Sequence, residues 1–320
     1  MKSIRIVTAF FDIGRADFGE YARDNDTYFS YFRFWARIQN EMLVYCAPEH
    51  AARVMGIRAE YGLAERTRIV PIADPFAIEP ELYRRMTQAA ADPGFQTFRY
   101  YRAPENGAPY SYVTMLKAWC LADAAERTRE DCLWAWVDFG INHSGVKYLR
   151  SEDFDFLWER DFPEKITAFC HFDPAEVSLI DALQFMIPCF DGSVVVMPGA
   201  LCRPYWEAVR GAMEALVKLG CVDDDQMLSL IAYKERPDLF DIRLERGWYS
   251  AFELCGGRRF CLAEPAPAQF DDRAARTMFR LSQAPQHPFI RRMYEKVIQY
   301  YYPEARERDP GEQTAQGATD

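Results

Sequence analysis

One short apolar segment constrains the fold more than any other part of the chain. Residues 132–137 read CLWAWV and are followed at once by Asp138, Phe139 and Gly140. An apolar run of this length is typical of a strand buried on both faces, as in a parallel sheet covered by helices. A carboxylate that follows such a strand lies at the edge where open α/β sheets bind their ligands. The alternative is that Asp138 only caps a turn, for which Gly140 provides the bend.

The first part of the chain alternates apolar runs with segments of helical periodicity. Strands are predicted over residues 4–11, 42–46 and 68–72, and helices over residues 27–39 and 48–55. Asp26 or Thr27 is the expected N-cap of the first helix. Strands and helices in this order favour a parallel sheet joined by right-handed crossovers.

The later part of the chain continues the α/β pattern up to a charged, Gly/Thr-rich tail. We expect a single domain over residues 1–303 and a disordered tail over residues 304–320. Asp92-Pro-Gly94 is expected to break the chain after a helix, and residues 99–109 to form a loop. The remaining predicted strands cover residues 166–172, 193–197 and 248–252, and the remaining helices cover residues 80–91, 111–127, 205–219, 225–234, 271–281 and 289–301.

Charge and composition narrow the class of protein. Hydrophobic residues make up 49% of the 320 residues, which is enough for a substantial core. The formal net charge of −10 argues against a nucleic-acid binder, because binding phosphates along a duplex needs a basic face. An acidic protein that binds an anionic ligand must neutralise it locally, with a metal ion or with a few placed Arg and Lys residues.

The cysteines and the N-terminus indicate a cytoplasmic protein. The nine cysteines include no Cys-x-x-Cys pair and mostly lie in apolar runs, so we expect reduced core residues. The first residues enter a strand directly, which leaves no room for a signal peptide. No apolar run approaches the roughly 18 residues of a membrane span. Peripheral association with a membrane is left open.

The loop after the first strand is a candidate ligand-binding segment. It reads TAFFDIGR over residues 8–15. The exit of a first strand is where α/β proteins commonly place a nucleotide, and Arg15 could bind a diphosphate with two parallel hydrogen bonds. Neither a Gly-x-Gly-x-x-Gly nor a Gly-x4-Gly-Lys motif occurs, so a dinucleotide-binding or ATP-motor function is unsupported. The alternative for Arg15 is a solvated surface residue.

Two further segments supply charged candidates. Lys117 lies among apolar residues of a predicted helix and could reach the same sheet edge, although helical lysines are usually solvated. Asp223, Asp224 and Asp225 precede the helix over residues 225–234. Capping explains one of these acids, but crowding of three would raise at least one pKa, which suits a general base.

The four histidines divide into two pairs. His143 and His171 each follow a predicted strand and are expected at the same rim of the sheet, whereas His50 and His287 are expected to be structural. Neither a Gly-x-Ser-x-Gly nor a His-Glu-x-x-His motif is present. Serine-hydrolase and zinc-protease functions therefore have no motif to support them.

Taken together, four segments resemble the HtrL/YibB family, also called WlaTC-like. The resemblance extends roughly over residues 4–300 and is most specific in the opening TAFFDIGR. It implies a bacterial glycosyltransferase-like protein of surface-polysaccharide gene clusters. It also implies a GT-A-like fold, a mixed and mainly parallel sheet flanked by helices. The segments are residues 8–15 (TAFFDIGR), 31–37 (YFRFWAR), 136–141 (WVDFGI) and 224–226 (DDQ).

The resemblance also implies roles for individual acids. In GT-A enzymes a strand ends in Asp-x-Asp, whose acids bind the donor diphosphate through Mn²⁺ or Mg²⁺. Asp138 matches the first acid, but Gly140 stands where the second would be. Metal ligation then passes to Asn142, to His143 or to a distant residue, or the metal is not used.

The function predicted from the sequence is transfer of a sugar from a nucleotide-activated donor to a glycan or another hydroxyl acceptor (EC 2.4), in surface polysaccharide or glycoconjugate biosynthesis. The open alternatives are a sugar-nucleotide nucleotidyltransferase and an inactive sugar-nucleotide-binding protein that keeps the fold. Asp225, and next Asp224, match the later acid that acts as base or acceptor anchor. The predicted metal ligands are Asp138 and His143, and the predicted donor contacts are Thr8, Ala9, Phe10, Asp12, Arg15, Lys117, Asp138 and Gly140.

Overall fold

The structure is a computed structural model that describes residues 2–18, 22–98, 107–128, 130–145, 147–245 and 248–263. The chain divides into two units, residues 1–262 and 263–320, and the sheet and helices below belong to the first. The helices predicted over residues 271–281 and 289–301, His287 and the tail from residue 304 lie outside the described residues. The single domain over residues 1–303 stays a prediction.

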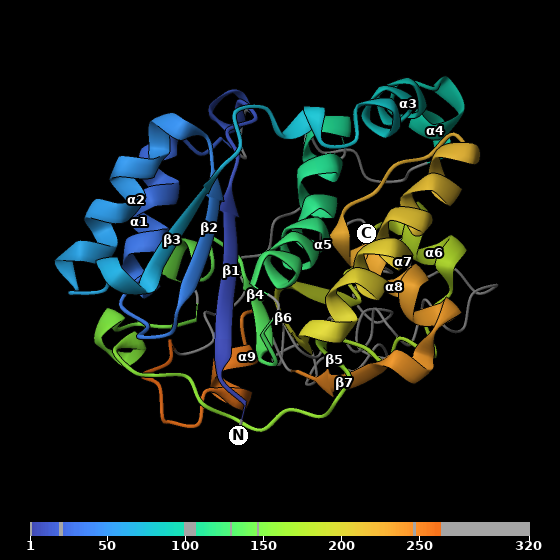
Figure 1. Cartoon of the computed structure of the whole chain (residues 1–320). Helices are drawn as coiled ribbons and strands as arrows, with labels where there is room; N and C mark the ends of the chain where they lie inside the picture. Colours follow the sequence, from blue (N-terminus) through green and yellow to red (C-terminus); the bar gives the residue numbers. More distant parts are fainter. Residues whose placement is uncertain are drawn as a thin grey trace, which may run out of the picture. The chain divides into compact units, whose positions relative to one another are not determined.

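A seven-stranded sheet forms the centre of the described unit (Figure 1). Its order is β3-β2-β1-β4-β6-β5-β7. The strands from β3 to β4 are parallel, β6 is antiparallel to both β4 and β5, and β7 is parallel to β5. This confirms the predicted mixed, mainly parallel sheet flanked by helices. The strands are β1 (Ile4–Phe10), β2 (Met42–Cys46), β3 (Thr67–Pro71), β4 (Leu133–Val137), β5 (Ile166–Cys170), β6 (Phe190–Pro198) and β7 (Phe240–Leu244).

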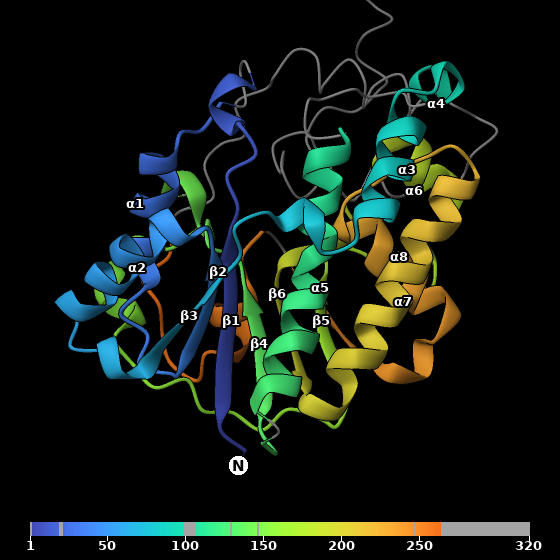
Figure 2. The same ribbon diagram turned by 45° about the horizontal axis from the view of Figure 1, so that its top comes forward.

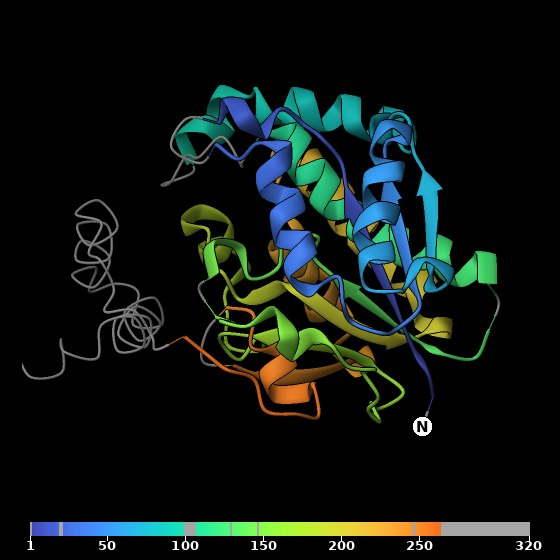
Figure 3. The ribbon, with the colours of Figure 1, turned by 90° about the vertical axis from the view of Figure 1, so that its left-hand side faces the viewer.

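Helices cover both faces of the sheet, as a strand buried on both sides requires. On one face α5 (Ala108–Thr128), α7 (Gly199–Lys218) and α8 (Asp225–Glu235) pack against one another and against β1, β4 and β6 (Figure 2). On the other face α1 (Asn25–Trp35), α2 (Pro48–Glu60) and α9 (Ala251–Cys255) share one apolar core with β1 and β4. Figure 3 shows α9 beside the chain that follows β4.

Local chemistry explains where the helices begin. Asp24 caps α1 by accepting a hydrogen bond from the backbone N–H of Thr27 at 2.8 Å, so the cap lies two residues before Asp26. Helix α7 begins at Gly199, earlier than the predicted residue 205, and contains Pro204. Helix α3 (Pro80–Ala90) ends as predicted before Asp92, but α4 (Pro93–Phe98) follows it, and α6 (Leu179–Phe185) was not predicted.

The strand predicted over residues 248–252 is wrong. Residues 248–250 form a turn that leads into α9, and Tyr249 has a φ of 64°, a left-handed conformation that no strand residue adopts. The last strand of the sheet is instead β7, which lies at the edge beside β5. Its sequence, FDIRL, alternates apolar and charged residues over only five positions.

Two predictions from composition can be compared with this unit. All nine cysteines carry free thiols and eight of them are buried, as expected of core residues. None of the helices among the described residues is both long enough and apolar enough to cross a membrane.

Candidate functional site

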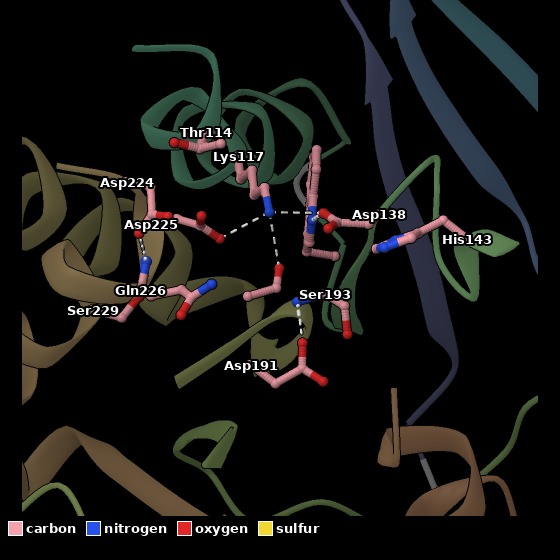
Figure 4. Close-up of polar contacts among 12 residues, drawn as sticks. Thr114, Lys117, Asp138, His143, Asp191, Ser193, Asp224, Asp225, Gln226 and Ser229 are labelled. Atoms are coloured by element: carbon pink, nitrogen blue, oxygen red, sulfur yellow. Dashed lines mark hydrogen bonds and ion pairs between the residues drawn. The ribbon is translucent and has the colours of Figure 1, made fainter. Parts of the chain in front are cut away.

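Three charged side chains from distant parts of the sequence meet beside the end of β4 (Figure 4). Lys117 comes from the middle of α5, Asp138 follows β4 and Asp225 opens α8. The Lys117 Nζ atom lies 2.8 Å from Asp138 Oδ1 and 2.8 Å from Asp225 Oδ2. The sequence analysis selected all three residues, and the structure brings them into one ion-paired cluster.

Lys117 is not the solvated lysine of the alternative hypothesis. Its side chain is 17% exposed, and its third contact is the carbonyl oxygen of Gly192 at 3.1 Å. An ammonium group has three hydrogens, so these three acceptors use its full donor capacity. Burial alone would lower the pKa of Lys117, but the charges of Asp138 and Asp225 outweigh burial and raise it well above its ordinary value.

Asp138 is fixed by backbone and side-chain contacts. Its backbone N–H donates to the carbonyl oxygen of Ser193 on β6 at 2.8 Å. Its Oδ1 atom also accepts a hydrogen bond from Trp136 Nε1 at 2.6 Å, so one oxygen serves both Trp136 and Lys117. Burial raises the pKa of Asp138 to about 6, against the opposing charge of Lys117 and with the help of the Asp225 charge. A turn-capping aspartate would have no such environment.

The three consecutive acids, Asp223, Asp224 and Asp225, have different hydrogen-bond and ion-pair partners. Asp224 is the N-cap of α8, because its side chain accepts from the backbone N–H of Gln226 at 3.1 Å. Asp223 accepts from the backbone N–H of Asp224 at 2.8 Å and is buried. Asp225 is therefore the acid that faces Lys117. Burial raises its pKa to about 6 although Lys117 opposes the shift, and the Asp224 charge adds to it. The predicted rise is present, but burial is its largest cause.

Two glycines allow close approach at the site. A Cβ atom at Gly192 would lie only 1.9 Å from Asp225 Oδ2, so any larger residue would displace that carboxylate. A Cβ atom at Gly140 would lie 3.3 Å from ring carbons of Tyr28. An aspartate at position 140, the second acid of an Asp-x-Asp motif, would therefore crowd this ring.

Residues 8–15 comprise the end of β1 and the loop that follows it. Thr8 and Phe10 are buried, and Phe10 packs on Phe29 with ring centroids 5.1 Å apart. Asp12 accepts hydrogen bonds from the backbone of Gly14 and the side chain of Asn25, which lower its pKa and shape the loop. Their roles as donor contacts, like that of Ala9, stay predictions.

Arg15 is buried, which makes the hypothesis of a solvated surface residue wrong. Its exposed fraction is 7%. Its guanidinium carbon lies 5.2 Å from the ring centroid of Phe18 and 5.1 Å from that of Tyr110. Stacking on aromatic rings holds the guanidinium plane in a fixed orientation.

The residues proposed as metal ligands do not make a complete metal site. The side chain of Asn142 is fully engaged, since its amide donates to the carbonyl oxygen of Tyr148 and accepts from the backbone of Lys147 and Tyr148. Burial lowers the pKa of His143 to about 4, so its imidazole is neutral, but one ring nitrogen contacts the Tyr249 hydroxyl. Within the ranges described, no group of three or more His, Cys, Asp or Glu residues could hold a metal ion. The assignment of Asp138 and His143 as metal ligands stays a prediction, and no chemical step is assigned to a metal.

Among the described residues, two further histidines, His50 and His171, have contacts outside the Lys117 cluster. His50 packs between Phe10 and Phe29, in agreement with its predicted structural role. His171 lies beside Trp248, with its Nδ1 atom 3.4 Å from Glu245 Oε1.

Sequence reasoning missed several residues of the site. Trp136, Gly192 and Ser193 contact Lys117 or Asp138, and Asp191 lies next to them. The tripeptide Asp191-Gly192-Ser193 directly precedes an apolar run, which is a turn signal that could have been used. Nothing in the local sequence distinguishes Tyr249.

Comparisons with known proteins identify the family. The family model described as "Bacterial protein of unknown function (HtrL_YibB)" matches residues 2–256. The protein HtrL of Escherichia coli (strain K12) is 30% identical over 278 residues, which is 78% of this chain and 92% of HtrL.

Two solved structures show a remote likeness. The apo form of mouse xyloside xylosyltransferase 1 has a TM-score of 0.40 at 11% identity, over 75% of this chain and 85% of that chain. The PaToxG glycosyltransferase has a TM-score of 0.35 at 8% identity, over 95% of this chain and 87% of that chain. The family is established by the sequence matches: this chain belongs to the HtrL/YibB family.

Proposed function

We propose that this chain is a GT-A-like glycosyltransferase that moves a sugar from a nucleotide-activated donor to a hydroxyl group of a glycan or another acceptor. The single observation that carries the proposal is the buried ammonium of Lys117 between the carboxylates of Asp138 and Asp225. This cluster lies beside the carboxyl end of β4, where open α/β sheets bind ligands. An ion pair placed there is available to a ligand, unlike one within the core.

Asp225 is the proposed general base. The acceptor hydroxyl oxygen forms a bond to the anomeric carbon, the bond from that carbon to the diphosphate oxygen breaks, and the hydroxyl proton passes to Asp225. A pKa of about 6 suits this task, because the carboxylate is ionised at neutral pH yet more basic than an ordinary aspartate. If configuration at the anomeric carbon is retained, Asp225 instead orients or stabilises the sugar.

Positive charge near the leaving group is supplied by the chain itself. Arg15, stacked on Phe18 and Tyr110, is the proposed partner of the diphosphate. Lys117 offsets the charge of one of the two carboxylates, so that an anionic donor meets one net negative charge there in place of two. Direct contact of Lys117 with phosphate would require it to release one of its three present acceptors.

Binding of the donor tests the proposal first. Nucleoside diphosphates and their sugars should raise the melting temperature of the protein. Because Arg15 is the proposed partner of the diphosphate, we expect this stabilisation to persist in EDTA and not to depend on added Mn²⁺. A stabilisation that EDTA removes and Mn²⁺ restores would assign Asp138 and His143 as metal ligands.

Product formation tests it second. Wild-type protein, a stabilising nucleotide sugar and hydroxyl acceptors should yield a product heavier by one sugar residue in mass spectrometry. Asp138→Ala should abolish product while the protein stays folded. The matched control is Asp153→Asn, a buried aspartate that accepts from the backbone of Cys261 and pairs with Arg150. Failure of every nucleotide sugar to bind would refute the proposed function.

A further inference from the structure

Another buried carboxylate, that of Asp191, lies near the ion-paired cluster (Figure 4). Asp191 is 2% exposed and is the second residue of β6. Its Oδ1 atom accepts from the backbone N–H of Ser193 at 2.8 Å, and its Oδ2 atom accepts from the backbone N–H of Tyr249 at 2.8 Å. One side chain therefore links the start of β6, where the pairing with β5 shifts register, to the turn at Tyr249, 58 residues away in sequence.

This irregular stretch of β6 contains Gly192, which contacts the ion-paired cluster twice. Its carbonyl oxygen accepts from Lys117 Nζ, and its Cα atom faces the Asp225 carboxylate so closely that no Cβ atom fits. A displacement of this stretch would change the surroundings of Lys117 and Asp225 together.

The turn at the other end of this link contains Tyr249, whose side chain reaches His143. Its hydroxyl contacts His143 Nδ1, and its side chain is buried. Its φ of 64° is unfavourable for a bulky residue, so contacts around it must hold the backbone in place. The hydrogen bond from its N–H to Asp191 is one such contact.

Two titratable residues, Glu245 and His171, lie near Asp191. Burial, helped by the charge of Asp191, raises the pKa of Glu245 to about 10, so Glu245 is a neutral acid near neutral pH. Burial also lowers the pKa of His171, which lies beside Glu245 and is therefore neutral as well. Two backbone N–H donors and a neutral acid are a suitable environment for one buried carboxylate.

We propose that Asp191 is a positioning residue that couples the irregular stretch of β6 at Gly192 to the turn at Tyr249 and so fixes Lys117, Asp225 and His143 in one arrangement. Its meaning for sugar transfer rests on the proposed function. The coupling itself is a property of the free protein and can be measured without any substrate.

Amine labelling of Lys117 tests the coupling. The full chain is treated with an amine-acylating reagent, and modification of Lys117 is measured by peptide mass spectrometry. Asp191→Asn keeps the size of the side chain but turns an NH₂ donor toward one of the two N–H groups. Loss of one hydrogen bond should increase the labelling rate of Lys117 about tenfold. Asp153→Asn also loses a buried carboxylate, but the partners of Asp153 are Cys261 and Arg150, which do not contact Lys117. This control should leave the labelling rate of Lys117 unchanged.

A second variant distinguishes the side chain of Tyr249 from its backbone hydrogen bond to Asp191. Tyr249→Phe removes the hydroxyl contact with His143 but keeps the backbone N–H that Asp191 accepts. It should leave Lys117 labelling at the wild-type rate. Labelling of Lys117 that rises as much as in Asp191→Asn would show that the link does not run through Asp191.

Turnover adds a readout that a purely structural role would not change. With a donor and acceptor that give product, Asp191→Asn should lower kcat about tenfold with little change in donor affinity, because placement rather than binding is impaired. Wild-type protein that binds no nucleotide sugar would refute the proposed function but leave the labelling result standing. Lys117 labelling at the wild-type rate in a folded Asp191→Asn variant would overturn the inference.

If the Asp191→Asn variant does not fold, hydrogen exchange of the backbone amides in the wild-type protein tests the coupling instead. The amides of Ser193 and Tyr249 share one acceptor side chain, so both should open with similar protection. A difference of about a hundredfold between the two amides would show independent opening and overturn the coupling.

Discussion

Two cations of the molecule, the buried Arg58 and the partly buried Lys117, differ in the kind of partner that each meets. Arg58 of α2 is fully buried, and its partners are neutral: the carbonyl oxygens of Ala36, Ile38 and Asn40 and the hydroxyl of Thr67. Lys117 instead meets two carboxylates and one carbonyl oxygen.

The two cations differ in the groups with which they pair: Arg58 pairs with backbone carbonyl oxygens, and Lys117 pairs mainly with carboxylates. Arg58 closes the connection between α1 and β2 by filling backbone acceptors that would otherwise be buried without partners. Burial lowers its pKa to about 10, which still leaves it charged at neutral pH. Lys117 holds together two acids whose burial raises their pKa values, an arrangement that contributes little to stability and is typical of functional sites.

The largest expected effect concerns stability. Arg58→Met leaves several buried acceptors unpaired and should lower the free energy of unfolding by about 3 kcal/mol or more. Chemical denaturation measures this loss. The control is Arg33→Met, an exposed arginine paired with Glu60, which should cost less than about 1 kcal/mol. Equal losses in the two variants would contradict the structural role of Arg58.

A smaller effect is expected at the close approach between Gly192 and Asp225. Gly192→Ala puts a Cβ atom where Asp225 Oδ2 now lies and should reduce turnover about tenfold or more, with the fold retained. The control is Gly211→Ala in α7, where a Cβ atom meets nothing within 4 Å. That change should stabilise the protein by roughly 0.5–1 kcal/mol and leave turnover unchanged. Turnover that falls equally in both variants would remove the argument from proximity.

The smallest effect is the pH dependence of turnover. The base must be ionised, and the pKa of Asp225 is about 6, so the rate should rise as pH increases through about 6 and then level off. Asp138 and Asp225 both contact Lys117, so the midpoint belongs to the pair and not to one residue. A rate profile measured from pH 5 to about 8 checks this. A rate that falls through that range would require a protonated acid instead.

The fold was more predictable from the sequence than the site was. Strands such as β4 and helices such as α5 can be recognised from the local sequence, because burial determines the spacing of their apolar residues. β7 was missed because its alternating pattern is only five residues long, and residues 248–252 were assigned as a strand because their aromatic composition resembles that of one.

The site could be predicted only where a residue type is unusual for its surroundings. Lys117 in an apolar helix face and Asp138 after a buried strand are such cases. The contacts of Asp191 with Tyr249 and of Gly192 with Lys117 depend on tertiary geometry, so the local sequence does not predict them. The same holds for Arg15, whose burial depends on Phe18 and Tyr110.

The most direct test of the central claim is a comparison of donor affinity and turnover in Asp225→Asn. The asparagine keeps the size of the side chain but cannot accept a proton. Turnover at saturating donor should fall by roughly 10²-fold or more while the donor Kd changes little. Asp153→Asn should match the wild-type protein in both quantities. A collapse of donor affinity with turnover preserved at saturation would show that Asp225 binds the donor and would contradict its role as the base.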